Sequence, residues 1–336
     1  MSPLRPLVPG LVLCAAGAAI TLVVSAAIQH ATGLSLELLV AVILGIIAGN
    51  LVRVPRAADA GVLFTSKKLL RVGVGLLGLS VPAAEILDLG WMPLVTVGLV
   101  VTIGLLAAIP LGRAFGLTRE QSLLIGAGCS ICGAAAIAAV EGITTRKRQH
   151  EFITAIAVIV LLGTLMIGAG PLAAHLLGWD NISTGVFLGA STHEVSQAVA
   201  AGQVAGAAVL PIAVTVKLAR VLCLGPMMAL LAVAERRHVK SSARPGDPDV
   251  VLPPLIPVFV IGFVSLVLVR TFVAVPEPVI DATSWIRTLL FSAAMFAQGL
   301  GVTAATITTA GHKPFAFGGI LTLVVIAISA TGAVLV

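Results

Sequence analysis

Charged residues are scarce in this chain of 336 residues. Asp, Glu, Lys and Arg together make up 10% of the sequence, whereas soluble domains contain roughly a quarter of these residues. Apolar residues make up 59%, and the mean hydropathy is +1.14. This composition excludes an ordinary soluble domain and predicts an all-α polytopic membrane protein.

Further absences exclude other classes of protein. The four cysteines all lie in apolar stretches, so they do not form an extracellular disulfide framework. The net charge of +6 comes from cations scattered through short loops and carries no nucleic-acid signal. His193 and Glu194 resemble the start of a zinc-protease motif, but Gln197 stands where the second histidine would be. We therefore expect no metal site, no cofactor and no enzymatic activity.

Apolar stretches of membrane-spanning length, about 20 residues, predict about 11 transmembrane helices. The first follows Arg5 as in a signal peptide, yet its apolar run is too long for one, so we expect an uncleaved extra helix over residues 1–30. The eleven stretches cover residues 7–27, 36–52, 61–80, 91–112, 121–140, 151–176, 183–202, 207–234, 251–273, 284–309 and 313–336.

A charged pentapeptide occurs twice in apolar surroundings, as Lys68-Leu69-Leu70-Arg71-Val72 and as Lys217-Leu218-Ala219-Arg220-Val221. With the first helix set aside, the other ten form two sets of five, and the pentapeptide lies in the second helix of each set. An odd number of helices separates the copies, which predicts a 5+5 inverted repeat, as in many secondary transporters. We place the repeats at residues 31–180 and 181–336, with a cytoplasmic loop at 235–250.

Glycine clusters in the fourth helix of each set predict two broken crossing helices. One cluster runs from Gly126 to Gly133, and the other from Gln298 to Gly301. Glycine lowers helix stability by about 1 kcal/mol relative to alanine. Small residues also pack unbroken helices closely against each other, and this alternative stays open.

Buried cations are the first candidates for a site. Lys217 and Arg220 lie deep in their span, three residues apart on one helical face, and charges at that depth normally face a cavity or a partner. The alternative is a structural ion pair, for which Glu194 is the obvious partner. Lys68 and Arg71 share the spacing, but Lys68 could lie at the membrane interface.

A second candidate is the segment with His193, Glu194 and Gln197. On one helix these side chains would share a face that combines a carboxylate, an amide and a titratable imidazole; the alternative is a polar network that holds helices together. All six Asp lie in loops or at span edges. A cation exchanger with crossing broken helices needs a carboxylate at the crossing, so the deep positive charges favour a small anion as substrate.

Taken together, these motifs resemble the YeiH-like family of proposed sulfate exporters over nearly the whole chain. The resemblance rests on five segments, namely residues 68–72, 73–79, 130–133, 193–202 and 217–221. It implies a bacterial inner-membrane protein with a sulfate-like substrate. It also implies a distant fold relationship to sodium/proton antiporters and bile-acid symporters, with crossing broken helices in a moving core beside a scaffold panel.

We therefore expect a secondary transporter that exports a small inorganic or sulfonate-type anion by alternating access. Its partners would be the anion, the lipid bilayer and, in one possible arrangement, a second copy as a homodimer. Lysines and arginines in the loops predict a cytoplasmic N-terminus. The loop Arg146-Lys147-Arg148 does not fit this orientation, because it would then face outward. The residues expected to bind the anion are Lys68, Arg71, Ser130, Cys132, Lys217, Arg220 and Gln298, and those expected to couple or gate transport are His193, Glu194 and Gln197.

Two alternative functions stay open. A sodium- or proton-coupled symporter for an organic anion would use Glu194 as its cation site. A membrane thiol oxidoreductase would use Cys129 and Cys132.

Overall fold

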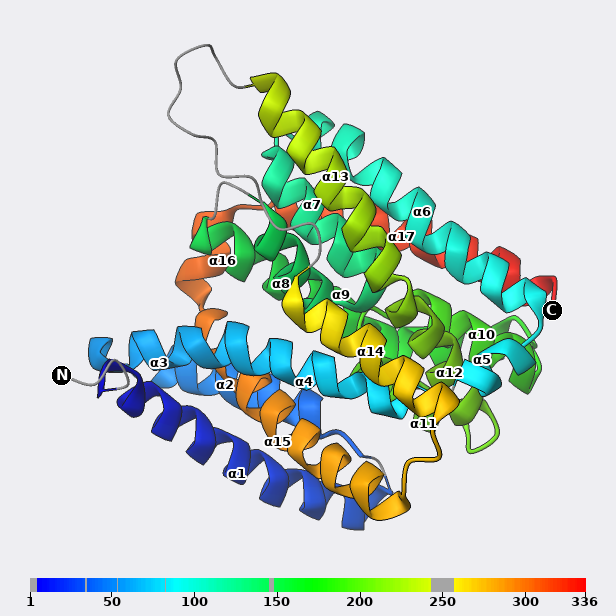
Figure 1. Ribbon diagram of the computed structural model, residues 1–336, viewed down its shortest axis with the longest axis horizontal. Helices are drawn as coiled ribbons and strands as arrows, with labels where there is room; N and C mark the ends of the chain where they lie inside the picture. The colour runs from blue at the N-terminus through cyan, green and yellow to red at the C-terminus, as the bar shows by residue number, and fades with distance from the viewer. Residues whose placement is uncertain (1–4, 34, 53, 82, 145–147, 243–256) are drawn as a thin grey trace.

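The computed structural model describes residues 5–33, 35–52, 54–81, 83–144, 148–242 and 257–336, and every regular element in these ranges is helical (Figure 1). Six helices there are long and apolar enough to cross a membrane. They are α1 (Val8–Thr32), α6 (Trp91–Ala114), α9 (Gln149–Leu176), α12 continued by α13 (Val209–Leu222 and Leu224–Ser242), α15 (Glu277–Gly301) and α17 (Lys313–Val334).

The other expected spans are short or interrupted helices. Two are single short helices, α2 (Glu37–Leu51) and α14 (Val258–Phe272). Residues 59–80 form α3 (Asp59–Phe64), a π-helical turn (Thr65–Leu69), α4 (Leu70–Leu77) and a 3-10 turn. The remaining two expected spans are each interrupted. One consists of α7 (Arg119–Ala127), a π-helical turn (Gly128–Cys132) and α8 (Ala134–Ile143). The other consists of α10 (Asn181–Ser191) and α11 (Val195–Ala205). The count of eleven spans therefore stays a prediction.

The helices form two bundles (Figure 1). We call α1 to α4, α14 and α15 the first bundle; α15 packs against α1, α2 and α4, and α14 packs along α4. The second bundle contains α6 to α13 and α17, in which α10 packs between α12 and α17. Short helices α5 (Ala83–Asp88) and α16 (Ala304–Ala310) connect neighbouring helices. The bundles meet mainly through α11 against α2, α8 against α4 and α13 against α14.

Glycines allow the helices of the first bundle to approach closely. A Cβ on Gly299 of α15 would meet the backbone of Val42 and Gly45 in α2. Residues Gln298 to Gly301 continue α15 as a helix. The predicted break in this segment is present, but it lies directly after these glycines, where α15 ends at Gly301 and α16 begins at Ala304. Gly299 itself packs α15 against α2.

The break between α15 and α16 lies at Val302 and Thr303. Asn50 of α2 satisfies the backbone there, because its amide donates to the Val302 carbonyl at 3.1 Å and its oxygen accepts from the Ala304 N–H at 2.8 Å. This interruption lies in the first bundle, away from the break in the second.

The predicted loop at 235–250 begins as a helix. α13 continues to Ser242, and Glu235 is buried in an ion pair with Arg119 of α7. A polar sequence can extend a helix where a buried partner satisfies its charge. Residues 243–250 lie outside the described residues. The same holds for Arg146 and Lys147, in the loop that does not fit the predicted orientation.

Candidate functional site

Two interrupted helices face each other in the second bundle. Between the π-helical turn and α8, Gly133 has φ +66°, a conformation that favours glycine. Between α10 and α11, Thr192 and Glu194 have extended backbone. We did not expect this second interruption, because the sequence there contains neither proline nor a glycine cluster.

Arg220 of α12 joins the C-terminal ends of the first half of each interrupted helix. Its guanidinium donates to four carbonyls, those of Cys129 at 2.7 Å, Ser130 at 3.3 Å, Ala190 at 2.5 Å and Thr192 at 2.7 Å. Helix C-termini carry partial negative charge and unpaired carbonyls. A buried guanidinium compensates both.

Lys217, one turn before Arg220 on α12, is also fully buried. Its ammonium donates to the Thr192 carbonyl. Among the side chains that the structure describes, Lys217 and Glu194 do not form an ion pair within 4 Å. Both cations are buried inside the protein, and their hydrogen bonds go to the backbone and not to a carboxylate.

Glu194 lies where the N-termini of the second half-helices converge. Its Oε1 accepts from the Ala134 N–H at the start of α8 at 3.0 Å. The same carboxylate accepts from the backbone N–H of Gln197, whose side chain in turn accepts from the Glu194 N–H at 2.9 Å. This capping box fixes Glu194 at the positive ends of α8 and α11.

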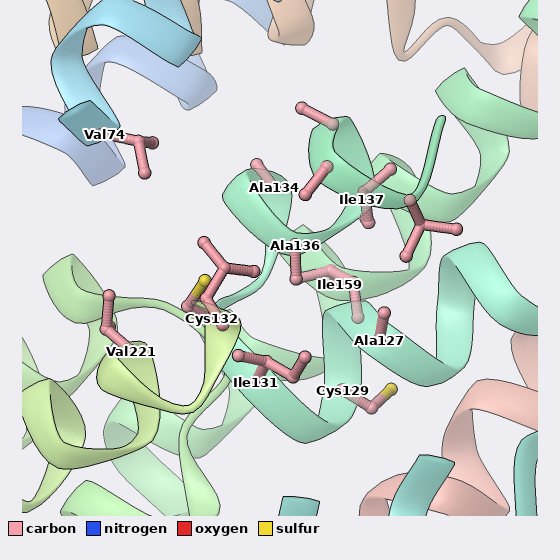
Figure 2. Packing of buried hydrophobic residues seen from close by; sticks show 14 of the residues in the cluster. Val74, Ala127, Cys129, Ile131, Cys132, Ala134, Ala136, Ile137, Ile159 and Val221 are labelled. Carbon is pink, nitrogen blue, oxygen red and sulfur yellow. The ribbon is translucent and has the colours of Figure 1, made fainter. Parts of the chain in front are cut away.

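Beside the Glu194 carboxylate is a cavity of about 40 Å³ between the two bundles, which we call the interbundle cavity. The second bundle contributes Cys132, Ala134, Ala135, Glu194, Val195, Ser196 and Val221, and the first contributes Leu38, Leu70, Val74, Leu77, Phe291 and Met295. Figure 2 shows Cys132, Ala134 and Val221 close together, with Val74 facing them from the first bundle.

A second cavity of about 180 Å³, the entrance cavity, adjoins the first. The two cavities share Leu38, Leu77, Val195, Ser196 and Phe291 as lining residues. Glu37 and Arg287 also line the entrance cavity, and Arg287 donates to the hydroxyls of Ser80 and Ser284. A guanidinium thus stands in the outer cavity and apolar side chains separate it from Glu194.

His193 and Glu194 do not share a surface, contrary to the helical arrangement predicted from their spacing. Successive side chains of an extended segment point to opposite sides. Accordingly, Nε2 of His193 lies 3.0 Å from Oγ1 of Thr322 in α17. That hydroxyl donates to the Gly318 carbonyl at 2.8 Å, so Nε2 is the donor and the neutral tautomer leaves Nδ1 as an acceptor.

The remaining predicted residues lie in separate places. Cys132 lines the interbundle cavity, but the Ser130 hydroxyl lies against Gly104 of α6. Gln298 lines a cavity of about 410 Å³ with Asp59 and Ser66, which we call the opposite cavity.

Lys68 and Arg71 line a fourth cavity of about 720 Å³, between α4 and α14. Arg71 pairs with Glu141 at 3.1 Å and donates to the Ala138 carbonyl of α8 at 2.9 Å, and Lys67 pairs with the same carboxylate. The predicted anion-binding set is therefore not assembled at one point.

Three features of the site were not predicted from the sequence. Ala134 acts through its backbone, which no side-chain pattern marks. Phe291 and Arg287 lie on α15, four residues apart, and reach the cavities only because α15 packs against α4. Glu141 was a detectable signal, since it is a carboxylate at the end of an apolar stretch.

Comparisons with known proteins give a consistent picture. The sequence model of a family described as Conserved hypothetical protein 698 matches residues 9–318. A UPF0324 membrane protein of Corynebacterium glutamicum is 42% identical over 98% of this chain and 93% of its own. UPF0324 membrane proteins of Pseudomonas aeruginosa (36% identical, 96% and 92% covered) and Pseudomonas putida (35% identical, 85% and 81% covered) also match. No solved structure matches. The chain therefore belongs to the Conserved hypothetical protein 698 family, whose bacterial relatives are named UPF0324 membrane proteins.

Proposed function

We propose that this protein is a secondary transporter that carries a small anion across the bacterial inner membrane by alternating access. One observation carries the proposal: the N-termini of α8 and α11 converge beside a cavity between two bundles. Unpaired N–H groups and the helix dipole make such N-termini favourable places for anions. Interrupted helices whose ends line a cavity are a recurrent feature of transporters.

The charges around the interruptions favour an anion over a cation. Lys217 and Arg220 carry two formal positive charges, against one negative charge on Glu194. In the entrance cavity, Arg287 would attract an anion toward the apolar constriction. The Glu194 carboxylate is already held by backbone N–H donors, which argues against its use as a sodium site in a cation-coupled symporter.

The two bundles supply the parts that alternating access needs. The entrance cavity contains Arg287, and the opposite cavity contains Gln298, eleven residues later on α15. At 1.5 Å per residue these positions lie roughly 16 Å apart along the helix. Movement of one bundle against the other would open the interbundle cavity toward one side or the other. The pentapeptides lie in different bundles, on α4 and α12, and a 5+5 inverted repeat remains part of the proposal.

The proposed direction is export of a sulfate-like anion. An interior-negative potential drives each negative charge outward by about 2.3 kcal/mol per 100 mV, so a divalent anion gains about 4.6 kcal/mol. This orientation assumes a cytoplasmic N-terminus. A thiol oxidoreductase is less well supported, because Cys129 and Cys132 are both buried free thiols whose side chains point to different sides in Figure 2.

Flux in proteoliposomes tests the proposal. Vesicles loaded with radiolabelled sulfate, sulfite, phosphate or a small sulfonate are given a potassium-diffusion potential, and efflux is followed. We expect potential-dependent efflux of at least one anion with the native protein and with Arg148→Ala, which removes an exposed cation that is not a lining residue of these cavities. Gly133→Leu should abolish the flux. Absence of flux for every anion at both signs of the potential would reject an anion carrier.

A further inference from the structure

We propose that the Glu194 carboxylate is a tethered competitor of the transported anion, which binds only after Glu194 has gained a proton. The inference rests on the anion carrier proposed above and adds its coupling ion. It follows from three observations: the N–H donors that the carboxylate occupies, the small volume of the interbundle cavity beside it, and the apolar surface of the first bundle onto which it could move.

The carboxylate occupies the hydrogen-bond donors that an oxyanion would need. Glu194 accepts from the Ala134 N–H at the start of α8 and from the Gln197 N–H in the first turn of α11. These are the donors on which the anion site depends. A substrate oxygen and a carboxylate oxygen cannot both take the same N–H in good geometry.

The cavity does not hold both anions together. Its volume is about 40 Å³, whereas a single water molecule already needs about 10–15 Å³. An oxyanion of sulfate size therefore needs the volume that the carboxylate fills. Two negative charges a few ångströms apart in a buried cavity also repel strongly. The side chain of Glu194 must move away or lose its charge.

Movement of an ionised carboxylate is disfavoured by its surroundings. The side chain packs against Gly133, where a Cβ would overlap its Cγ, and this blocks one direction. Across the cavity the first bundle presents only apolar side chains among the described lining residues, namely Leu38, Leu70, Val74, Leu77, Phe291 and Met295. A charge transferred onto such a surface loses its hydrogen bonds without replacement. A protonated carboxyl group avoids this cost.

The titratable groups around Glu194 are few. Lys217 of α12 and Cys132 of the π-helical turn are close enough to interact with its charge. His193 and Arg220 in turn interact with Lys217. Lys217 and Arg220 donate to backbone carbonyls, and His193 donates to Thr322. None of these groups has a hydrogen bond to the carboxylate, so Glu194 itself is the group that takes up the proton.

The consequence is coupled movement of one proton with each anion. The empty carrier changes conformation with an ionised Glu194 at the helix N-termini, and the loaded carrier changes conformation with the anion there and a protonated Glu194. A divalent anion then moves with a net charge of −1. The membrane potential still favours its export, at half the charge of uncoupled transport.

Binding of radiolabelled sulfate to the purified, monodisperse protein between pH 5.5 and 8.5 tests the inference. For the native chain we expect affinity to fall up to tenfold per pH unit above the titration of Glu194, because each binding event takes up one proton. Glu194→Gln keeps the shape and an oxygen acceptor without a charge, and it should bind sulfate with an affinity that does not vary with pH. Glu151→Gln is the matched control, since Glu151 is equally buried but bonds Thr118 and Arg148; it should keep the native profile.

Infrared difference spectra of the native protein provide a measurement that does not depend on a variant. Addition of sulfate should produce a protonated-carboxyl band, and Glu194→Gln should lack it. Sulfate binding that does not vary with pH in the native chain would overturn the coupling and leave the anion carrier standing. A pH dependence retained in Glu194→Gln would do the same. If neither protein binds or transports any tested anion at any pH, the carrier itself is rejected.

Discussion

The guanidinium of Arg220 donates to the backbone carbonyl of Thr192 at 2.7 Å. Through this bond a cation on α12 holds the end of α10, and through its bonds to the carbonyls of Cys129 and Ser130 it holds the π-helical turn. Arg220 is therefore a structural centre of the second bundle. Its charge contributes to the field at the site, while its donors are engaged by the backbone.

Arg220→Ala should destabilise the protein by more than about 3 kcal/mol. Each hydrogen bond to a charged group contributes about 1.5–3 kcal/mol, and the substitution leaves four buried carbonyls without this donor. Thermal unfolding in detergent, followed by circular dichroism, measures the loss. Arg148→Ala serves as control, because its side chain is 53% exposed and its ion pair with Glu151 should contribute about 1 kcal/mol or less. Equal melting of Arg220→Ala and native protein would contradict the structural role.

Gly133→Ala should impair both stability and anion binding. The residue has φ +66°, and an added Cβ would overlap the side chain of Glu194. The backbone strain alone costs on the order of 1–3 kcal/mol, and Glu194 must shift from the N-terminus of α8. Gly168→Ala on α9 is the matched control, since nothing lies within 4 Å of its added Cβ. Sulfate binding and melting temperature should both fall in Gly133→Ala, whereas Gly168→Ala should bind sulfate as the native protein does and melt no earlier, because alanine is the better helix former. Unchanged binding and melting in Gly133→Ala would remove Glu194 from this position.

The sequence predicted the helical class, the interruption before α8 and the one that follows Gly301, and it marked Lys217 and Arg220, which are buried. These features follow from local signals, namely apolar length, charge inside an apolar run and glycine content. The break at Thr192 to Glu194 has no such signal. It is stabilised from other parts of the chain, by Arg220 at one end and by the capping box at the other.

The predicted anion-binding residues lie apart for a similar reason, namely that tertiary contacts and not local sequence signals determine where their side chains point. Ser130 and Cys132 are two residues apart in a helical turn, so their side chains point in different directions, one toward Gly104 and the other toward the interbundle cavity. His193 and Gln197 would share a face on a continuous helix. The extended segment between α10 and α11 separates them, and only tertiary contacts determine that segment.

Asn50→Ala should loosen the α15–α16 junction without affecting the interbundle cavity. The Asn50 amide bonds the Val302 carbonyl and the Ala304 N–H, so alanine leaves both backbone groups without this partner. Hydrogen exchange of residues 302–310 should accelerate by at least tenfold, while residues 133–140 exchange at the native rate. Asn50→Asp keeps the acceptor for Ala304 and should give an intermediate rate. Hydrogen exchange at the native rate in Asn50→Ala would show that the Asn50 side chain does not stabilise this junction.

Phe291→Ala should open the constriction between the entrance and interbundle cavities. The ring lines both cavities and packs against Gly73 of α4, so its loss joins a volume of about 180 Å³ to one of about 40 Å³. Cys132 lines the inner cavity and can report on access to it.

The measurement is the rate at which a small anionic thiol reagent labels Cys132, followed by mass spectrometry. The other three cysteines, Cys14, Cys129 and Cys223, are replaced by alanine. Labelling should be slow with Phe291 present, because the thiol is 5% exposed, and at least tenfold faster in Phe291→Ala. Phe272→Ala is the control, since that ring is 80% exposed at the end of α14 and its removal should leave the rate unchanged. If Phe291→Ala and Phe272→Ala label at the same rate, an anion reaches Glu194 by a different route and the entrance cavity is not its path.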